Sequence, residues 1–322
     1  MTAATPPPQL PRLVLGTMTF GAPVTRDTAE QMLRACATAG ITMIDTANVY
    51  AGGASETMLG ELLAGRREEF WLASKVGMPS PEAGDDAPLS RRAIRACLDA
   101  SLRRLGTDYL DVYYLHQPDR ATPAEETLAA IDEQVQAGKV RYLGVSNYAA
   151  WQIGELACVA ARTGYPAPVI SQPLYNLVAR RIEAEYAEFA TRAGLANVVY
   201  NPLGGGLLTG KHQFDRAEAD GRFGEQGLGP MYRQRYWTRP LFDAVAALQD
   251  AAASRGWTLT EAALRWLLSR DLVTSVLLGA SSLEHLTANI AACQGPAPDA
   301  ELCARFDEIW RGLDGPAPAY NR

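Results

Sequence analysis

The sequence predicts an α/β fold in which eight parallel strands alternate with helices and close into a (β/α)8 TIM barrel. Strand-like apolar runs occur near residues 13, 42, 70, 110, 141, 169, 197 and 274, mostly with helical patterns between them. A chain of 322 residues suits an α/β barrel that folds as one unit. A doubly wound open sheet is the alternative, but its GxGxxG fingerprint follows no first strand. We expect one barrel over residues 1–322, with a flexible start at 1–10, a short N-terminal hairpin, and extra C-terminal helices and loops.

The early part of the chain repeats one unit, a helical pattern followed by a strand. In residues 25–40 apolar side chains recur at the helical period, and Gly40 stands where a left-handed C-cap belongs before the strand ITMID. Residues 90–106 repeat this arrangement, with Gly106 ending the helix before the strand YLDVYYLH. Helices therefore feed strands in the order that a barrel requires.

The later part continues the alternation and then departs from it. Thr122 and Glu125 predict a capping box with Pro123 at the first helical position, ahead of the strand VRYLGVSN. The runs PVISQ, NVVYN and TSVLLG predict the remaining strands. The stretch from His212 to about Pro240, rich in Gly and Arg, is too long for an ordinary loop, and we expect it to cover the site.

Composition narrows the class of protein. The chain is 48% hydrophobic and 20% charged, as in globular proteins with a large core. The net charge is −6 and no cluster of five or more lysines and arginines occurs, which argues against a nucleic-acid partner. The five cysteines are odd in number and form no CxxC pair, which indicates reduced thiols and a cytoplasmic location. Neither a signal-type start nor a run of about 18 apolar residues is present, so we expect no membrane partner.

Four polar residues, Asp45, Tyr50, Lys75 and His116, follow the ends of three successive strands, within ITMIDTANVY, FWLASK and DVYYLH. Because the carboxyl ends of barrel strands meet on one face, we expect these side chains to be neighbours. Reduction of a carbonyl leaves a basic alkoxide oxygen that needs a proton, and this set can deliver one. The placement predicts a carbonyl reductase.

Each of the four residues is expected to have its own role. Tyr50 would donate the proton, and because an ordinary phenol has a pKa of about 10, the Lys75 ammonium would have to lower it. Asp45 would anchor and neutralise Lys75, while His116 would donate a hydrogen bond to the carbonyl oxygen. Taken singly, they could be a helix cap, a loop aromatic, a solvated strand end and a core histidine. Their joint occurrence at three strand ends favours catalysis.

Other catalytic classes lack their motifs. The histidines are His116, His212 and His285, and none has HExxH or another ligand spacing, so we expect no metal. The GxSxG motif of serine hydrolases is also missing.

The phrases GTMTFG, IDTANVY, ASETMLGELL, SLRRLGTDYLDVYYLHQPD, GKVRYLGVSNY and SQPLYN run through nearly the whole chain. On these motifs the chain resembles the aldo-keto reductase family. Within that family the phrases SNYAAW, YNPLGGGLLTGK, GRF, MYRQRYW, GASSLEHL and AYNR are similar to the aflatoxin aldehyde reductase subfamily. The resemblance implies an NADPH-dependent reductase, and the subfamily resemblance implies a homodimer.

The resemblance also implies that NADPH lies extended across the barrel mouth without a Rossmann motif. Ser146, Asn147 and Gln172 would hold the nicotinamide carboxamide, and Tyr200 would stack on the ring; amides and hydroxyls suit that neutral group. The other interpretation of SNY is a strand-to-helix turn with Asn147 as the cap. The full set of implied cofactor-binding residues is Gly16, Thr17, Ser146, Asn147, Gln172, Tyr200, Asn201, Pro202, Leu203, Gly205, Leu207, Lys211, Arg222, Gly279, Ser281, Ser282, His285 and Asn289.

Residues 201–211 resemble the family's pyrophosphate loop, in which glycines allow backbone amides to approach phosphates. Gly205, Gly210 and Lys211 also fit the P-loop spacing GxxxxGK. The next residue, however, is His212 instead of Ser or Thr, and the segment HQFDRAEADG has the pattern of a loop and not of the required helix. We therefore reject a nucleoside triphosphatase and keep Lys211 as a phosphate contact.

Arg222 and residues 281–289 resemble the clamp for the adenosine 2′-phosphate. A helix that starts near Ser282 would present amide groups to an anion. The sequence departs from the wider family here, because His285 replaces the usual Gln or Arg and Ala288 the frequent Glu. NADPH over NADH is the expectation, although the serines could also be simple helix caps.

The subfamily resemblance implies four substrate-binding residues. Arg233 and Arg322 would present cations to a substrate carboxylate, and Met18 and Met78 would line the pocket. The alternative is an exposed loop arginine and a frayed terminus. We expect a small aldehyde that bears an acid group or a second carbonyl.

Two other functions stay open. A reductase of keto sugars or natural-product intermediates would keep every catalytic residue and change the segment over the site. A regulatory subunit that resembles reductases would act by binding a partner, as channel-associated members do. A long, specialised N-terminal segment would favour that role, and only about a dozen residues precede the first strand here.

Overall fold

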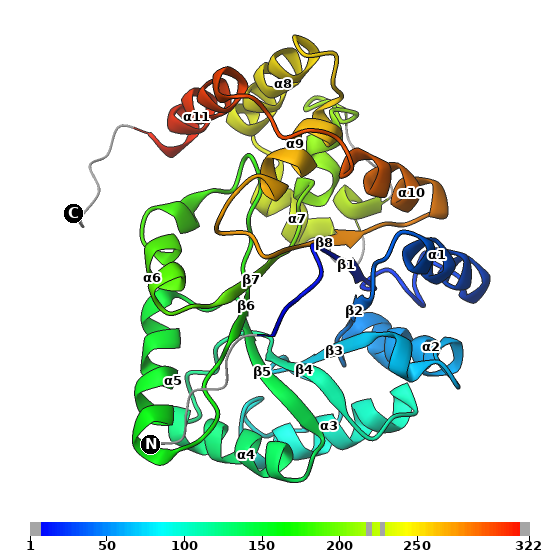
Figure 1. The fold of residues 1–322 in the computed structure, drawn as a ribbon, viewed down its shortest axis with the longest axis vertical. Coiled ribbons are helices and arrows are strands. Elements are labelled where there is room, and N and C mark those ends of the chain that lie inside the picture. The colour runs from blue at the N-terminus through cyan, green and yellow to red at the C-terminus, as the bar shows by residue number, and fades with distance from the viewer. Residues whose placement is uncertain (1–7, 217–220, 226–228, 316–322) are drawn as a thin grey trace.

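The computed structural model of the chain describes residues 8–216, 221–225 and 229–315. Eight parallel strands form a closed barrel in sequence order, and β8 pairs with β1 to close it (Figure 1). Each strand begins within one residue of the predicted position, so the predicted fold class is confirmed. The strands are β1 (Leu13–Gly16), β2 (Met43–Asp45), β3 (Trp71–Val76), β4 (Leu110–Leu115), β5 (Val140–Ser146), β6 (Ile170–Gln172), β7 (Ala196–Val199) and β8 (Ser275–Gly279).

Helices surround the barrel (Figure 1). The α-helices are α1 (Arg26–Thr38), α2 (Ala54–Leu62), α3 (Arg91–Leu105), α4 (Ala124–Gln136), α5 (Ala150–Thr163), α6 (Tyr186–Arg192), α7 (Gly229–Tyr236), α8 (Arg239–Ala253), α9 (Leu259–Leu268), α10 (Leu283–Ala292) and α11 (Ala300–Asp314). Short 3-10 helices are η1 (Tyr50–Gly53), η2 (Arg67–Glu69), η3 (Arg181–Glu183), η4 (Gly204–Thr209) and η5 (Gly221–Phe223). The expected left-handed residues are confirmed, since φ is 72° at Gly40 and 61° at Gly106.

The core has an inner and an outer part because successive strand residues point to opposite faces of the sheet. Val14, Met43 and Val112 point inward and pack in a cluster that fills the barrel. Their neighbours Leu15 and Ile44 point outward into the larger cluster between strands and helices. The barrel is thus packed inside as well as outside, and the polar site is confined to one end.

One local prediction at a helix end is wrong, and one at the N-terminus is described only in part. Residues 8–12, the described residues before β1, contain no strand, and Pro8 and Pro11 lack the N–H groups that a ladder needs. Leu10 from this segment instead packs with the inner cluster. The rest of the predicted hairpin and flexible start falls on residues 1–7, outside the described residues. The capping box before α4 is absent, because Pro123 is the N-cap and the Thr122 hydroxyl donates to Asp119 Oδ2 at 2.7 Å.

The extra C-terminal helices are present. The segment from His212 to Pro240 includes η5 and the helix α7, where only a long loop was predicted. Its aromatic side chains explain the order: Phe223 contacts Trp237, with ring centroids 5.1 Å apart, and Tyr232, with centroids 6.3 Å apart. The helices α8 and α11 pack together at the edge of the barrel (Figure 1).

Candidate active site

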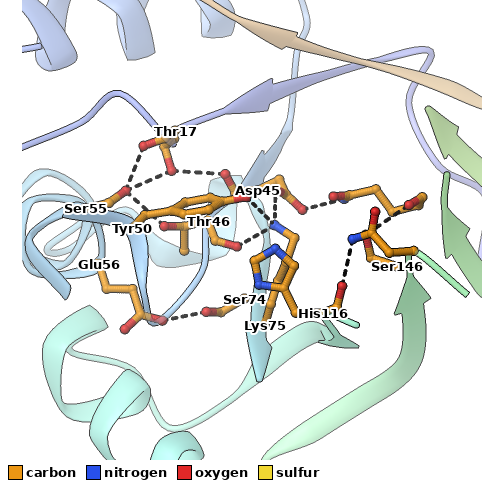
Figure 2. Close-up of polar contacts among 12 residues, drawn as sticks. Thr17, Asp45, Thr46, Tyr50, Ser55, Glu56, Ser74, Lys75, His116 and Ser146 are labelled. Carbon is orange, nitrogen blue, oxygen red and sulfur yellow. Dashed lines mark hydrogen bonds and ion pairs between the residues drawn. The ribbon is translucent and has the colours of Figure 1, made fainter. Parts of the chain in front are cut away.

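The structure brings Asp45, Tyr50, Lys75 and His116 together at the carboxyl ends of the strands (Figure 2). Asp45 is the last residue of β2 and Lys75 the second-last of β3, while His116 follows β4 directly. Tyr50 begins η1 in the connection from β2 to α2. The parallel register of β2, β3 and β4 therefore places the four side chains side by side, as the sequence predicts.

Lys75 is the centre of the group. Its fully buried ammonium pairs with the Asp45 carboxylate, donates to the Thr46 carbonyl oxygen at 2.7 Å, and lies 3.4 Å from the Tyr50 hydroxyl. The Gln172 amide donates to the other carboxylate oxygen of Asp45 at 2.8 Å. A buried ion pair of this kind holds its partners in one geometry, because leaving either charge unpaired is costly.

The protonation states follow from burial and from these charges. Burial alone would lower the pKa of Lys75, but Asp45 and Tyr50 raise it, and the net pKa lies above the ordinary value. Burial raises the pKa of Tyr50 and Lys75 lowers it by less, so the net pKa is raised. The expected lowering by Lys75 is thus present but outweighed, because the phenolate loses its hydration. Tyr50 keeps its proton and Lys75 its charge at neutral pH.

His116 is uncharged in this environment. Burial, and then the Lys75 ammonium, lower the pKa of His116 to about 3. Its ring meets the Tyr50 ring edge-on, with centroids 6.0 Å apart. Within the described part of the chain, His116 Nδ1 is buried and has no hydrogen-bond partner. A neutral imidazole of this kind can donate one hydrogen bond to a ligand and cannot supply a second charge.

The residues expected at the carboxamide lie beside this group. The Ser146 hydroxyl donates to the Gln172 carbonyl oxygen at 2.9 Å, and Asn147 donates to the His116 carbonyl oxygen at 2.9 Å. The Tyr200 hydroxyl donates to Asn147 Oδ1 at 2.7 Å. Asn147 adopts a left-handed φ of 61°, which suits Asn better than most residues. Polar side chains at or directly after the ends of β5, β6 and β7 thus border the four residues.

The expected pyrophosphate loop contains three consecutive glycines in left-handed conformations. Gly204, Gly205 and Gly206 have φ values of 60°, 70° and 104°, and a side chain at Gly205 would meet Tyr232 at 2.6 Å. Asn201 Oδ1 accepts from the Gly205 amide at 2.6 Å. Pro202 and Leu207 are buried, Leu203 is half-buried, and Lys211 is exposed. No helix starts at residues 211–216, which supports the rejection of a P-loop.

The residues of the expected adenosine clamp lie at the start of α10, on that helix, and beside Met18. Ser282 is the N-cap of α10 and accepts from the His285 amide at 3.2 Å, and the Ser281 hydroxyl lies 3.4 Å from His285 Nδ1. Asn289 is buried on the same helix. Arg222 Nη1 lies 3.7 Å from Met18 Sδ.

The remaining predicted residues lie near strand ends or in the segment from His212 to Pro240. Gly16 pairs in the sheet with Gly279. The Thr17 hydroxyl is buried and donates to the Asp45 carbonyl oxygen at 3.0 Å. Met78 is half-buried two residues after β3, and Arg233 Nε donates to the Phe223 carbonyl oxygen. The terminal Arg322 falls outside the described residues.

Sequence reasoning missed three contributors. Thr46 supplies the carbonyl oxygen that accepts from Lys75, and Ser55 hydrogen-bonds to the Thr46 hydroxyl at 2.9 Å. Tyr232, from α7, is close enough to raise the pKa of Tyr50, although its effect is smaller than those of burial, Lys75 and Asp45. The motif ASETMLGELL does contain Ser55, but nothing in its spacing points to the site.

Two absences apply to the described residues alone. They contain no group of three or more His, Cys, Asp or Glu side chains arranged to hold a metal ion. Among the same residues no helix has both the length and the apolar character needed to cross a membrane.

The chain is similar along its length to known reductases. The model of the aldo/keto reductase family matches residues 12–311. Human aflatoxin B1 aldehyde reductase member 2 is 37% identical over an alignment of 333 residues that covers 98% of this chain and 91% of that protein. Human aldo-keto reductase family 7 member A3 is 37% identical over 328 residues, 97% of each chain. A probable voltage-gated potassium channel subunit beta of Arabidopsis thaliana is 34% identical over 292 residues, 87% of this chain and 88% of that protein. The chain therefore belongs to the aldo/keto reductase family, as its motifs predicted, and is an oxidoreductase.

Proposed function

We propose that the protein reduces the carbonyl group of an aldehyde or ketone with NADPH, and that Tyr50 donates the proton. The observation that carries this proposal is the buried contact of Lys75 with both Asp45 and Tyr50, beside an uncharged His116. A protonated phenol, a fixed ammonium and a neutral imidazole are the groups that a nascent alkoxide needs.

The four side chains divide the work. Tyr50, which holds its proton because burial raises its pKa, passes that proton to the carbonyl oxygen. Lys75 then stabilises the resulting phenolate across 3.4 Å, and Asp45 keeps the ammonium in place. His116, uncharged, donates a hydrogen bond that orients the carbonyl oxygen. No group in this set has to change its charge except the donor itself.

The residues around the four fit NADPH. Ser146, Asn147 and Gln172 offer neutral donors and acceptors for a carboxamide. Residues 204–206 are left-handed glycines without side chains, as in the family's pyrophosphate loop, and the exposed Lys211 carries a charge that matches phosphates. When bound, NADPH supplies the hydride that is added to the carbonyl carbon.

The substrate is the finer part of the proposal. A small aldehyde with an acid group would suit Arg233, since a guanidinium binds carboxylates in a bidentate manner. Arg233 is on α7 with Tyr232, the side chain that influences the pKa of Tyr50. The relatives named aflatoxin B1 aldehyde reductase support an aldehyde over a ketone.

The test is NADPH consumption with a panel of aldehydes and ketones that includes acidic and neutral aldehydes of similar size. Tyr50→Phe should lower kcat by about 10²–10⁴-fold, the usual contribution of a general acid. Tyr109→Phe is the matched control, because Tyr109 precedes β4 at the opposite end of the strands and its hydroxyl meets Glu68. Full activity of Tyr50→Phe would refute the donor assignment, and equal KM values for acidic and neutral aldehydes would refute the acidic substrate.

The similarity to a potassium channel subunit favours a second candidate, a regulatory subunit that binds a partner. The reductase-named relatives match more of this chain, 97–98% against 87%, and so favour catalysis. Absence of turnover across the whole panel would favour the regulatory role.

A further inference from the structure

We propose that Ser55 is a positioning residue for the proton donor, because its hydroxyl closes the segment that presents Tyr50. The inference rests on the proposed function, in which Tyr50 supplies the proton. Ser55 is the second residue of α2 and is completely buried, so it touches neither solvent nor substrate.

Three buried hydroxyls, those of Thr17, Thr46 and Ser55, form a cluster that we call the hydroxyl clamp (Figure 2). Ser55 Oγ donates to the Thr17 carbonyl oxygen at 2.9 Å. Since serine has one O–H proton, the 2.9 Å contact between Ser55 and Thr46 then has Thr46 as donor. Thr46 and Ser55 are nine residues apart, and Tyr50 lies between them. The clamp therefore joins the two ends of the donor's segment.

The hydroxyl clamp also reaches the ionic part of the site. The Thr17 hydroxyl donates to the Asp45 carbonyl oxygen at 3.0 Å, and the Thr46 carbonyl oxygen accepts from Lys75 at 2.7 Å. The same cluster thus fixes the backbone beneath the carboxylate, the backbone contact of the ammonium, and the anchor of the tyrosine segment. A change at Ser55 would reach all three through one hydrogen-bond network.

The tyrosine segment, residues 46–55, needs such a clamp because its own backbone preferences do not favour the conformation that it adopts. Ala51, Gly52 and Gly53 have φ values of 49°, 63° and 94°, a left-handed run that an alanine rarely adopts. Asn48 is buried, and within the described ranges neither atom of its amide group has a hydrogen-bond partner. Segments in such conformations persist only where surrounding contacts determine them.

The distance that the clamp controls is a sensitive one. The Tyr50 hydroxyl oxygen and Lys75 Nζ are 3.4 Å apart, at the long end of hydrogen-bond geometry, so a small outward shift of the segment would separate them. Loss of the clamp should therefore weaken proton transfer more than substrate binding. A clamp that only stabilised the fold would instead change the melting temperature and leave the kinetics of the folded enzyme alone.

The chain offers a matched control. Ser101 on α3 is as buried as Ser55, but within the described structure its hydroxyl has no hydrogen-bond partner. Ser55→Ala should lower kcat for aldehyde reduction about tenfold with KM within about twofold, since small misplacements of catalytic groups are costly. Ser101→Ala should keep the wild-type kcat. Thr46→Val, which removes the other hydroxyl without changing shape, should resemble Ser55→Ala, and Thr46→Ser should restore activity.

The decisive measurement places Ser55→Ala in a Tyr50→Phe background. If Ser55 acts through the tyrosine, the tenfold loss disappears there, because coupled residues are not additive. A loss of equal size in both backgrounds, or a Ser55→Ala enzyme as active as Ser101→Ala, would overturn the proposal. Should Ser55→Ala fail to fold, the Thr46→Val and Thr46→Ser pair decides in the same way. An enzyme unaffected by Tyr50→Phe itself would refute the proton-donor function, a separate outcome.

Discussion

Replacement of Lys75 by methionine tests the electrostatic design of the site. The change keeps the length of the side chain and removes its charge, which leaves the buried Asp45 carboxylate without its ion-pair partner. Among the described residues, only the Gln172 amide, at 2.8 Å from Oδ2, would remain as a side-chain donor. A buried carboxylate in that position must either stay ionised at a high desolvation cost or take up a proton.

Uptake of a proton by this carboxylate sets an upper limit on the free energy of unfolding that the variant loses, and it makes that loss depend on pH. Protonating an ordinary aspartic acid, with a pKa of about 3.9, costs about 4 kcal/mol at pH 7 and about 1.5 kcal/mol at pH 5. In the variant the folded state binds a proton that the unfolded chain releases above pH 4, so the variant loses stability as pH rises. The destabilisation relative to wild type should therefore grow by about 1.4 kcal/mol per pH unit.

Urea unfolding followed by circular dichroism at pH 5, 6 and 7 measures this difference. Lys139→Met is the matched control: Lys139 pairs with Asp99 at 2.7 Å, but both side chains are about one-third exposed, so the loss should stay within about 1 kcal/mol. The double variant Asp45→Asn, Lys75→Met should be more stable than Lys75→Met at pH 7. A destabilisation that does not change with pH, or a double variant no better than the single one, would refute the reasoning.

Two further predictions concern acid stability and packing. Because the pKa of His116 is lowered to about 3 in the folded state, the unfolded chain binds a proton below about pH 6.5 that the folded state refuses, and stability falls as pH falls. His116→Asn should remove about 1 kcal/mol of the stability lost between pH 6 and pH 5 in urea unfolding, and His285→Asn, at an exposed position, should not; equal slopes in all three proteins would contradict this. Gly144→Ala should lower Tm by about 2–4 °C, because the new methyl would lie 2.4 Å from the buried Tyr114 ring. Gly154→Ala on α5, where a methyl meets nothing closer than 3.8 Å, should keep or raise Tm, and a thermal shift that is the same for both variants would disprove the packing argument.

The order and type of most elements could be predicted from the sequence because they depend on local periodicity. Apolar runs gave the eight strand positions, and Gly40 and Gly106 marked helix ends through their tolerance of positive φ. Local patterns failed where a competing partner was nearby. Thr122 bonds to Asp119 instead of capping α4, and the sequence offers no sign of that choice.

The meeting of Asp45, Tyr50, Lys75 and His116 could be predicted from their positions along the chain, because any closed parallel barrel brings successive strand ends to one face. The surroundings of these four side chains depend on long-range packing. The bond from Gln172 to Asp45 joins residues 127 positions apart, and the hydroxyl clamp joins Ser55 on α2 to the ends of β1 and β2. The direction of the Tyr50 pKa shift was also beyond the sequence: Lys75 and the phenol were both visible there, but the burial that outweighs the ammonium depends on every segment packed over the site.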